Sequence, residues 1–206
     1  MRISIVAAVA AAAIGLVPAS LAAQGDALTR DDRVMIVREL EESNKAFQAS
    51  VAGLSEAQWR FKPAPTRWSI AEVAEHLALV DQGLGGMART ALQPIPPFAA
   101  DSAAKLEVGV RGLYGDRSRR FNSPEGFVPA GQWPTQAGLM TAYDEARTAN
   151  LEYARSTADP LRARGGPHPA FGTLDGVHWM VVIAAHMNRH VQQIEDVKKA
   201  EGYPGR

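Results

Sequence analysis

Apolar residues recur at intervals of three and four along four stretches of the chain, which is the period of one face of an α-helix. This pattern predicts helices over residues 29–54, 69–87, 135–158 and 175–200, and no stretch alternates convincingly enough to predict a strand. Amphipathic helices bury their apolar faces against one another. We therefore expect an all-α protein that folds as an antiparallel four-helix bundle.

The ends of these helices carry recognisable signals. Ser69 is followed three residues later by Glu72, which is the pattern of a capping box at a helix start. Between the second and third helices, residues 92–134 form a long irregular connection with six prolines, in which residues 101–114 favour a short helix. Connections of this length are uncommon in compact domains and are often functional. We expect this one to cover one end of the bundle.

The first 23 residues have the layout of a secretory signal peptide. A short positive start precedes an apolar run over residues 3–17, which Pro18 interrupts before small residues at 20–23. A membrane-spanning helix needs about 20 apolar residues, so this run favours cleavage over retention as an anchor. The predicted mature chain, residues 24–206, is then one exported domain without a membrane span, in the periplasm or outside the cell.

The composition excludes several classes of function. The chain has 22 basic and 22 acidic side chains, whereas a general nucleic-acid binder would have a basic excess. It has no cysteine, which excludes disulfides, thiolate metal ligands and a cysteine nucleophile. Histidine and carboxylate side chains are therefore the metal ligands that remain. The sequence also lacks a phosphate-binding loop and a serine nucleophile elbow.

Three histidines lie on helix faces that the pattern predicts to be buried. His76 falls within the apolar stripe of the second helix, and His186 and His190 lie one turn apart on the inward face of the fourth. Buried imidazoles without partners cost about 1–3 kcal/mol each. One divalent ion such as zinc would satisfy all three and keep coordination positions open, as catalytic sites do. A purely structural histidine cluster is the alternative.

Other polar residues near these faces have more than one candidate role. Glu72 lies one turn before His76, where it could cap the helix, orient His76 or carry a proton. Glu75 is turned about 100° from His76 around the helix, so we expect it to be solvated. Four polar residues are candidates for lining a pocket or for buried hydrogen bonds: Asn44, Tyr143, Arg147 and Asn150. The remaining histidines are expected to be structural or exposed: His168 and His178.

Three blocks of sequence resemble the DinB-like superfamily. They are the segment Trp-Ser-Ile-Ala-Glu-Val-Ala-Glu-His-Leu at 68–77, residues 171–176, and Trp179 together with residues 184–194. The resemblance implies a four-helix bundle with a three-histidine site, whose ligands would be His76, His186 and His190. It also implies nickel or zinc as the ion, and an activity among hydrolases or small-thiol transferases.

These observations favour a metal-dependent hydrolase that acts on a small molecule. A bound ion would lower the pKa of water to roughly 7 and polarise an electrophile. Glu72 is the candidate catalytic proton carrier. Two alternatives stay open: a metal or small-ligand binding protein without turnover, and a thiol-dependent transferase. Export disfavours the transferase, because reduced thiols are scarce in oxidising compartments. The substrate stays open, as does the choice between a monomer and a homodimer.

Overall fold

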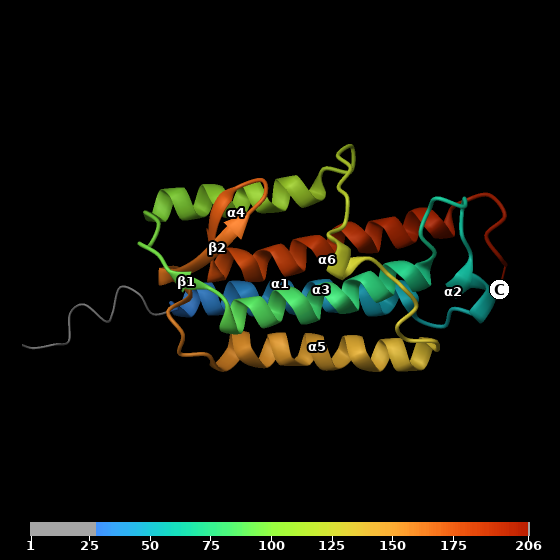
Figure 1. Cartoon of the computed structure of the whole chain (residues 1–206), viewed down its shortest axis with the longest axis horizontal. Coiled ribbons are helices and arrows are strands. Elements are labelled where there is room, and N and C mark those ends of the chain that lie inside the picture. The colour runs from blue at the N-terminus through green and yellow to red at the C-terminus, as the bar shows by residue number, and fades with distance from the viewer. Residues whose placement is uncertain (1–27, 206) are drawn as a thin grey trace, which may run out of the picture.

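The computed structural model describes residues 28–205, and four long helices form its body (Figure 1). They are α1 (Arg30–Val51), α3 (Ile70–Thr90), α5 (Gln136–Ser156) and α6 (Gly176–Lys198). The structure confirms the predicted four-helix bundle and places each helix within a few residues of its predicted bounds. The predicted signal peptide lies outside the described residues. No helix within residues 28–205 is long and apolar enough to cross a membrane.

Side chains at the helix starts explain why the helices begin where they do. Ser69 and Glu72 form the predicted capping box of α3, in which each side chain bonds the backbone N–H of the other residue. Thr29, Thr135 and Asp175 accept hydrogen bonds from the first turns of α1, α5 and α6. These caps satisfy N–H groups that have no partner within the helix.

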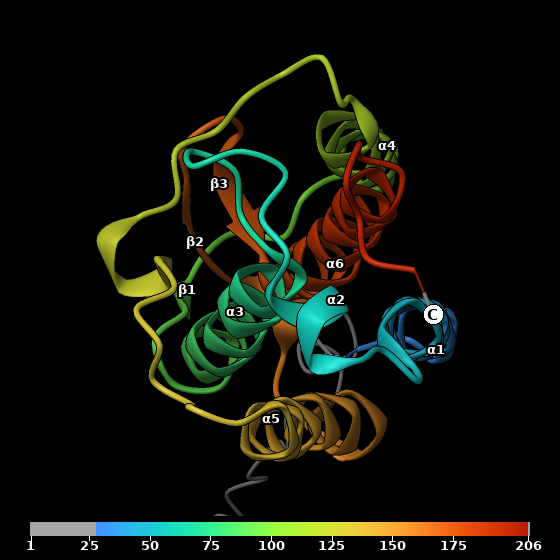
Figure 2. The same ribbon diagram turned by 90° about the vertical axis from the view of Figure 1, so that its right-hand side faces the viewer.

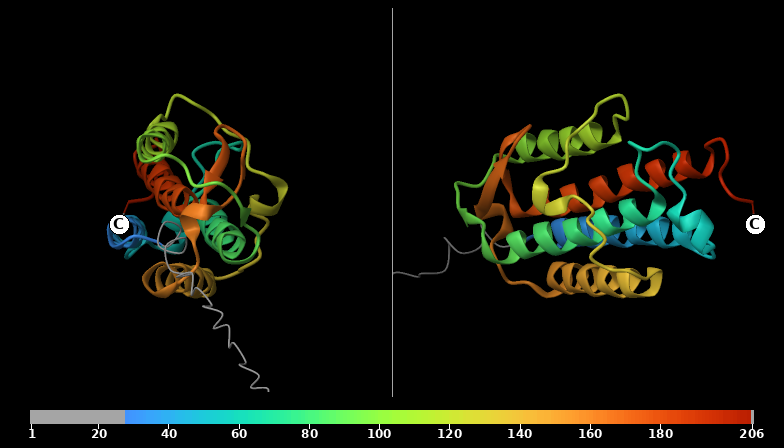
Figure 3. Two further views of the ribbon diagram at one scale, coloured as in Figure 1. Left: turned by 90° about the vertical axis from the view of Figure 1, so that its left-hand side faces the viewer. Right: turned by 45° about the vertical axis from the view of Figure 1, so that its right-hand side comes forward.

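The helices are arranged as two parallel pairs. Figure 1 shows α1 and α6 running in one direction and α3 and α5 in the other. Helices α1 and α6 pack against each other, as do α3 and α5. Neighbours from different pairs are antiparallel, as predicted, whereas partners within a pair are parallel. The long connection after α3 explains this order, because it travels back along the bundle before α5 begins (Figure 3).

That connection contains the predicted short helix, α4 (Ala100–Gly115), which packs along the outer side of α6 (Figure 2). A one-turn 3-10 helix, η1 (Glu125–Phe127), follows it. The segment between α1 and α3 also holds a short helix, α2 (Glu56–Arg60). The connection therefore lies over one side of the bundle and reaches the middle of α3.

The prediction that the chain has no strand was wrong. Strands β1 (Gln93–Pro94), β2 (Arg164–His168) and β3 (Gly172–Asp175) form an antiparallel sheet in the order β1-β2-β3, next to the 3-10 turn η2 (Leu161–Ala163). The β2 sequence, Arg-Gly-Gly-Pro-His, has low strand propensity, so local sequence could not identify it. Its pairing with β3 is what makes it a strand.

The buried apolar side chains fall into two clusters along the bundle. One lies around the first half of α6, near the sheet, and includes Ile36, Leu40 and Met180. The other includes Phe47, Leu77 and Ile194, toward the end that holds α2. Both clusters draw on the faces that the helical period identified.

Candidate metal centre

The structure brings His76, His186 and His190 together between α3 and α6. Nε2 of His186 lies 3.3 Å from Nε2 of His76 and 3.2 Å from Nε2 of His190. Ligand atoms of all three residues lie within 4.8 Å of one another. Within residues 28–205, this is the one group of three or more side chains with metal-ligating atoms arranged to hold an ion.

Two of the three rings are oriented through their second nitrogen. Nδ1 of His76 donates to the carbonyl oxygen of Phe127 at 2.6 Å, and Nδ1 of His190 donates to Oε1 of Gln193 at 2.8 Å. A neutral imidazole that carries its proton on Nδ1 has a lone pair on Nε2. Lone pairs of both rings therefore face Nε2 of His186. Ligating histidines are commonly oriented in this way.

The spacing of these nitrogens fits a tetrahedral ion. Zinc–nitrogen bonds of about 2.0–2.1 Å at tetrahedral angles put neighbouring ligand atoms about 3.3–3.4 Å apart. The two measured separations, 3.3 and 3.2 Å, match this value. Lone pairs at this distance repel one another without a proton or cation between them. The residues present therefore fit a divalent cation.

Burial keeps the rings neutral, the form that binds metal. It lowers the pKa of His76, and it lowers the pKa of His190 to about 3, with His76 contributing repulsion. Burial, together with the two neighbouring histidines, also lowers the pKa of His186 well below its ordinary value. His186 is partly exposed as a residue, but its Nδ1 is buried and has no hydrogen-bond partner.

Glu75 is not solvated, contrary to expectation. Its side chain is buried, and its carboxylate accepts hydrogen bonds from the backbone N–H groups of Ala130, Gly131 and Gln132 at 2.9–3.0 Å. The prediction failed because it considered α3 alone, whereas the connection after α4 folds back over this face of the helix. Glu75 thereby holds the segment that supplies the Phe127 carbonyl to His76.

Glu72 is at the edge of the same helix start. Its carboxylate accepts from the backbone N–H of Ser69 at 2.7 Å and from Nζ of Lys62 at 2.8 Å. Partial burial raises the pKa of Glu72, but these hydrogen bonds outweigh that effect and lower it. The carboxylate is therefore ionised at neutral pH. The orienting role considered for Glu72 is performed by Phe127, while its catalytic role stays a prediction.

The four inward polar residues all form hydrogen bonds: two of them bond to Asp81, and the other two bond to each other. Arg147 pairs with Asp81 at 2.8 Å, and Asn150 donates to the same carboxylate at 3.0 Å. Tyr143 donates to Asn44 at 2.8 Å. These contacts join α1, α3 and α5. Of the two roles considered for these residues, hydrogen bonding between the helices is therefore the one that the structure shows. Nothing in the sequence pattern had singled out Asp81.

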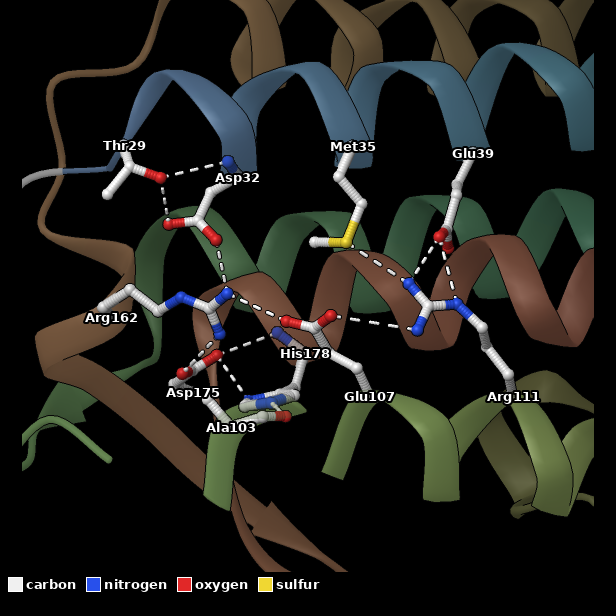
Figure 4. Close-up of polar contacts among 10 residues, drawn as sticks. All are labelled: Thr29, Asp32, Met35, Glu39, Ala103, Glu107, Arg111, Arg162, Asp175 and His178. Carbon is white, nitrogen blue, oxygen red and sulfur yellow. Dashed lines mark hydrogen bonds and ion pairs between the residues drawn. The ribbon is translucent and has the colours of Figure 1, made fainter. Parts of the chain in front are cut away.

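His178 belongs to a separate polar network between α1, α4 and the start of α6 (Figure 4). Its Nε2 donates to the carbonyl oxygen of Ala103 at 3.0 Å, and its ring lies beside Asp175. The Arg162 guanidinium bonds to Asp175, Glu107 and Asp32. This network fastens helices to one another, so His178 is structural, as expected.

Aromatic rings also lie beside the histidines, although the sequence had not indicated them as part of the site. The Trp68 ring lies 5.0 Å from His76 and 6.4 Å from His190, measured between centroids. The Tyr114 ring meets His186 edge to face, with centroids 5.6 Å apart. Burial raises the pKa of Tyr114 to about 12. Trp68 directly precedes the capping box of α3, so its place in the sequence could have indicated that it lies near His76. Tyr114 lies in the last turn of a separate helix, and no sequence pattern connected it to the histidines.

Comparison with known proteins identifies the family. The family model described as the DinB superfamily matches residues 39–194, a span that contains all three histidines. The chain belongs to the DinB superfamily. The uncharacterised protein YuaE of Bacillus subtilis (strain 168) is 26% identical over 147 residues, which are 71% of this chain and 87% of YuaE.

Two solved structures resemble this DinB superfamily protein. YfiT from Bacillus subtilis, a probable metal-dependent hydrolase with an unusual four-helix bundle topology, gives a TM-score of 0.52 at 13% identity. The match covers 85% of this chain and 91% of that one. TT2238, a four-helix bundle protein, gives a TM-score of 0.49 at 22% identity. This match covers 80% of this chain and 98% of TT2238. The likeness to YfiT supports the fold.

Proposed function

We propose that this protein is an exported metal-dependent hydrolase whose divalent ion, zinc or nickel, is held by His76, His186 and His190. The observation that carries the proposal is the convergence of three Nε2 atoms at the spacing of tetrahedral ligands. When bound at such a site, the ion makes water a stronger nucleophile and polarises the group under attack. The probable metal dependence of YfiT, whose fold is similar, supports the same reaction class.

The chain supplies ligands and orientation for this chemistry. Three histidine ligands leave at least one coordination position for a reacting molecule, which is the pattern of catalytic rather than structural zinc sites. The Phe127 carbonyl and the Gln193 side chain hold two of the rings in place. We assign Glu72 the role of proton acceptor, because its carboxylate is ionised and the residue precedes His76 by one turn of α3.

Metal analysis of the purified protein tests the site. We expect about one divalent ion per chain, and a loss of affinity of about 10–100-fold or more in His186→Ala and His190→Ala. Asn188→Ala is the matched control, because Asn188 is exposed on the same helix. Metal content that stays equal to wild type in both histidine variants would overturn the site.

A substrate panel then tests the reaction class. We expect the metal-loaded protein to hydrolyse at least one of a set of ester, amide and phosphoester substrates, and His190→Ala to abolish that activity. Glu72→Gln should reduce turnover while preserving the helix start, because glutamine can also complete a capping box. Full metal loading without hydrolysis of any substrate would favour a binding protein. Turnover that requires an added thiol would favour a transferase.

Export is tested separately from chemistry. The proposed signal peptide rests on the short apolar run at residues 3–17 and the small residues before position 24. Expression of the whole chain in a bacterial host, followed by intact-mass measurement of the exported fraction, should give a protein that begins at Ala23 or Gln24. Recovery of the intact chain from the membrane fraction would contradict cleavage.

A further inference from the structure

Tyr114 links the candidate metal centre to the β-hairpin. The residue lies in the last turn of α4, and its ring meets His186 edge to face with an interplanar angle of 79°. Its hydroxyl oxygen lies 3.2 Å from Nε2 of His168 on β2. The phenol therefore connects a candidate ligand on α6 with a histidine that is remote in the sequence.

The contacts of His168 determine which partner donates. The backbone N–H of Ala170 donates to Nδ1 of His168 at 3.1 Å, so this nitrogen carries the lone pair. Burial lowers the pKa of His168, so the neutral ring has its proton on Nε2. Nε2–H then donates to the oxygen of Tyr114. The hydroxyl proton of Tyr114 is left to donate to a different group.

Within residues 28–205, that proton has no acceptor in the protein. The same surroundings contain two further polar atoms without partners: the buried Nδ1 of His186, whose ring Tyr114 contacts, and the buried Nε1–H of Trp179, whose ring lies 5.3 Å from that of His168. Buried polar groups in folded proteins are nearly always hydrogen-bonded. The grouping points to a partner from outside the chain.

We propose that Tyr114 donates its hydroxyl proton in a hydrogen bond to an oxygen of the molecule bound at the three-histidine site, and that His168 is the positioning residue that orients this hydroxyl. The ligand class is therefore a small molecule with a carbonyl, carboxylate or phosphoryl oxygen. This inference deepens the proposed function and rests on it. It involves no proton transfer, because the phenol keeps its proton.

Cobalt provides a readout that does not depend on turnover. Cobalt(II) would be loaded into the full chain, and acetate would be titrated as the probe while the visible absorption of the ion is recorded. A hydrogen bond to a charged acceptor contributes enough to change affinity about tenfold. We expect Tyr114→Phe to bind acetate about tenfold more weakly, with cobalt affinity unchanged. Tyr153→Phe is the matched control, since Tyr153 lies on α5 and bonds Asp159.

Variants of His168 test the positioning role. Glutamine can place an amide N–H near the position of Nε2, whereas leucine cannot donate. We expect His168→Leu to weaken acetate binding as Tyr114→Phe does, and His168→Gln to restore most of the affinity. Melting temperatures of the cobalt-loaded variants would identify any variant that fails to fold. Among the folded variants, the difference in acetate affinity between His168→Gln and His168→Leu then tests the positioning role.

The outcomes separate the two proposals. Absence of cobalt binding to the wild-type chain overturns the metal site and this inference together. Cobalt binding with no response to acetate in wild type overturns the inference alone. Equal acetate affinity in wild type and Tyr114→Phe also overturns it. Loss of cobalt from Tyr114→Phe would make Tyr114 a support for His186, and would overturn the role assigned here.

Discussion

Nδ1 of His76 lies 2.6 Å from the carbonyl oxygen of Phe127, so a candidate ligand on α3 is oriented by a backbone group 51 residues later. The segment that carries this carbonyl is held in turn by Glu75, whose carboxylate accepts three backbone N–H groups of residues 130–132. Two neighbouring residues of one helix therefore have complementary roles. His76 faces the other two histidines of the candidate metal centre, and Glu75 holds the loop that orients His76.

Replacement of Glu75 by glutamine should weaken metal binding without removing a ligand. The amide loses the negative charge and one of the oxygens that accept from the loop, so the Phe127 carbonyl is held less firmly. We expect metal affinity to fall about 10-fold, within the range for residues that orient ligands. Glu125→Gln is the control, because Glu125 is exposed in the same loop. Equal metal affinity in Glu75→Gln and Glu125→Gln would contradict this role.

Two adjacent glycines of α3 should respond oppositely to alanine. A Cβ at Gly85 would lie 1.9 Å from Oδ1 of Asn150. The Asn150 side chain is fully buried and is held by hydrogen bonds with Asp81 and Arg89, so it has no room to move away. We expect Gly85→Ala to destabilise the fold by about 1–3 kcal/mol or more, as overpacking does. Urea denaturation would measure the change.

Gly86 is the matched control for this substitution. Nothing lies within 4 Å of a Cβ at Gly86, and its backbone is helical. Gly86→Ala should therefore stabilise the protein by about 0.5–1 kcal/mol through the higher helix propensity of alanine. Equal effects at the two positions would mean that α3 and α5 do not approach as closely as the structure shows.

The Arg147–Asp81 pair should be far more important for stability than the surface pairs. Both side chains are 1% exposed, so loss of the guanidinium would leave a carboxylate buried without its counter-charge. We expect Arg147→Met to cost about 3–5 kcal/mol. Arg155→Met, which breaks the half-exposed pair with Glu41, should cost less than about 1 kcal/mol. Similar denaturation midpoints for the two variants would refute this difference.

The metal-free protein should lose stability as the pH falls through the ordinary range of histidine. In the unfolded chain, imidazoles take up protons near pH 6.5. In the folded chain, burial lowers the pKa of His76 and His186, and lowers that of His190 to about 3. The unfolded state thus binds more protons below pH 6.5, so the free energy of unfolding decreases as the pH falls below that value.

Urea denaturation in the presence of a chelator, between pH 7.5 and pH 5, would measure this effect. The midpoint should decrease steadily below pH 6.5. A variant with leucine at both 186 and 190 should show a shallower decrease, because two of the responsible groups are absent. A midpoint that does not change over this range would mean that the rings are not held neutral in the folded state.

Local sequence was sufficient for the helices and for part of the site. The capping box of Ser69 and Glu72 and the four apolar stripes depend on neighbours within a few residues, so they could be identified without tertiary structure. The i, i+4 spacing of His186 and His190 likewise places both rings on one face. Strand β2 could not be identified, because its glycines and proline form a strand only when β3 pairs with them.

The helices, their buried faces and the three histidines of the candidate site could therefore be identified from the chain alone. Packing set the parallel pairing of α1 with α6 and of α3 with α5, and the burial of Glu75 under the returning loop. It also set the contacts of His76 with Phe127 and of His186 with Tyr114. The physical reason is that helix periodicity is a property of adjacent turns. The direction of the next helix, and the loop that covers it, depend on packing between residues far apart in the chain.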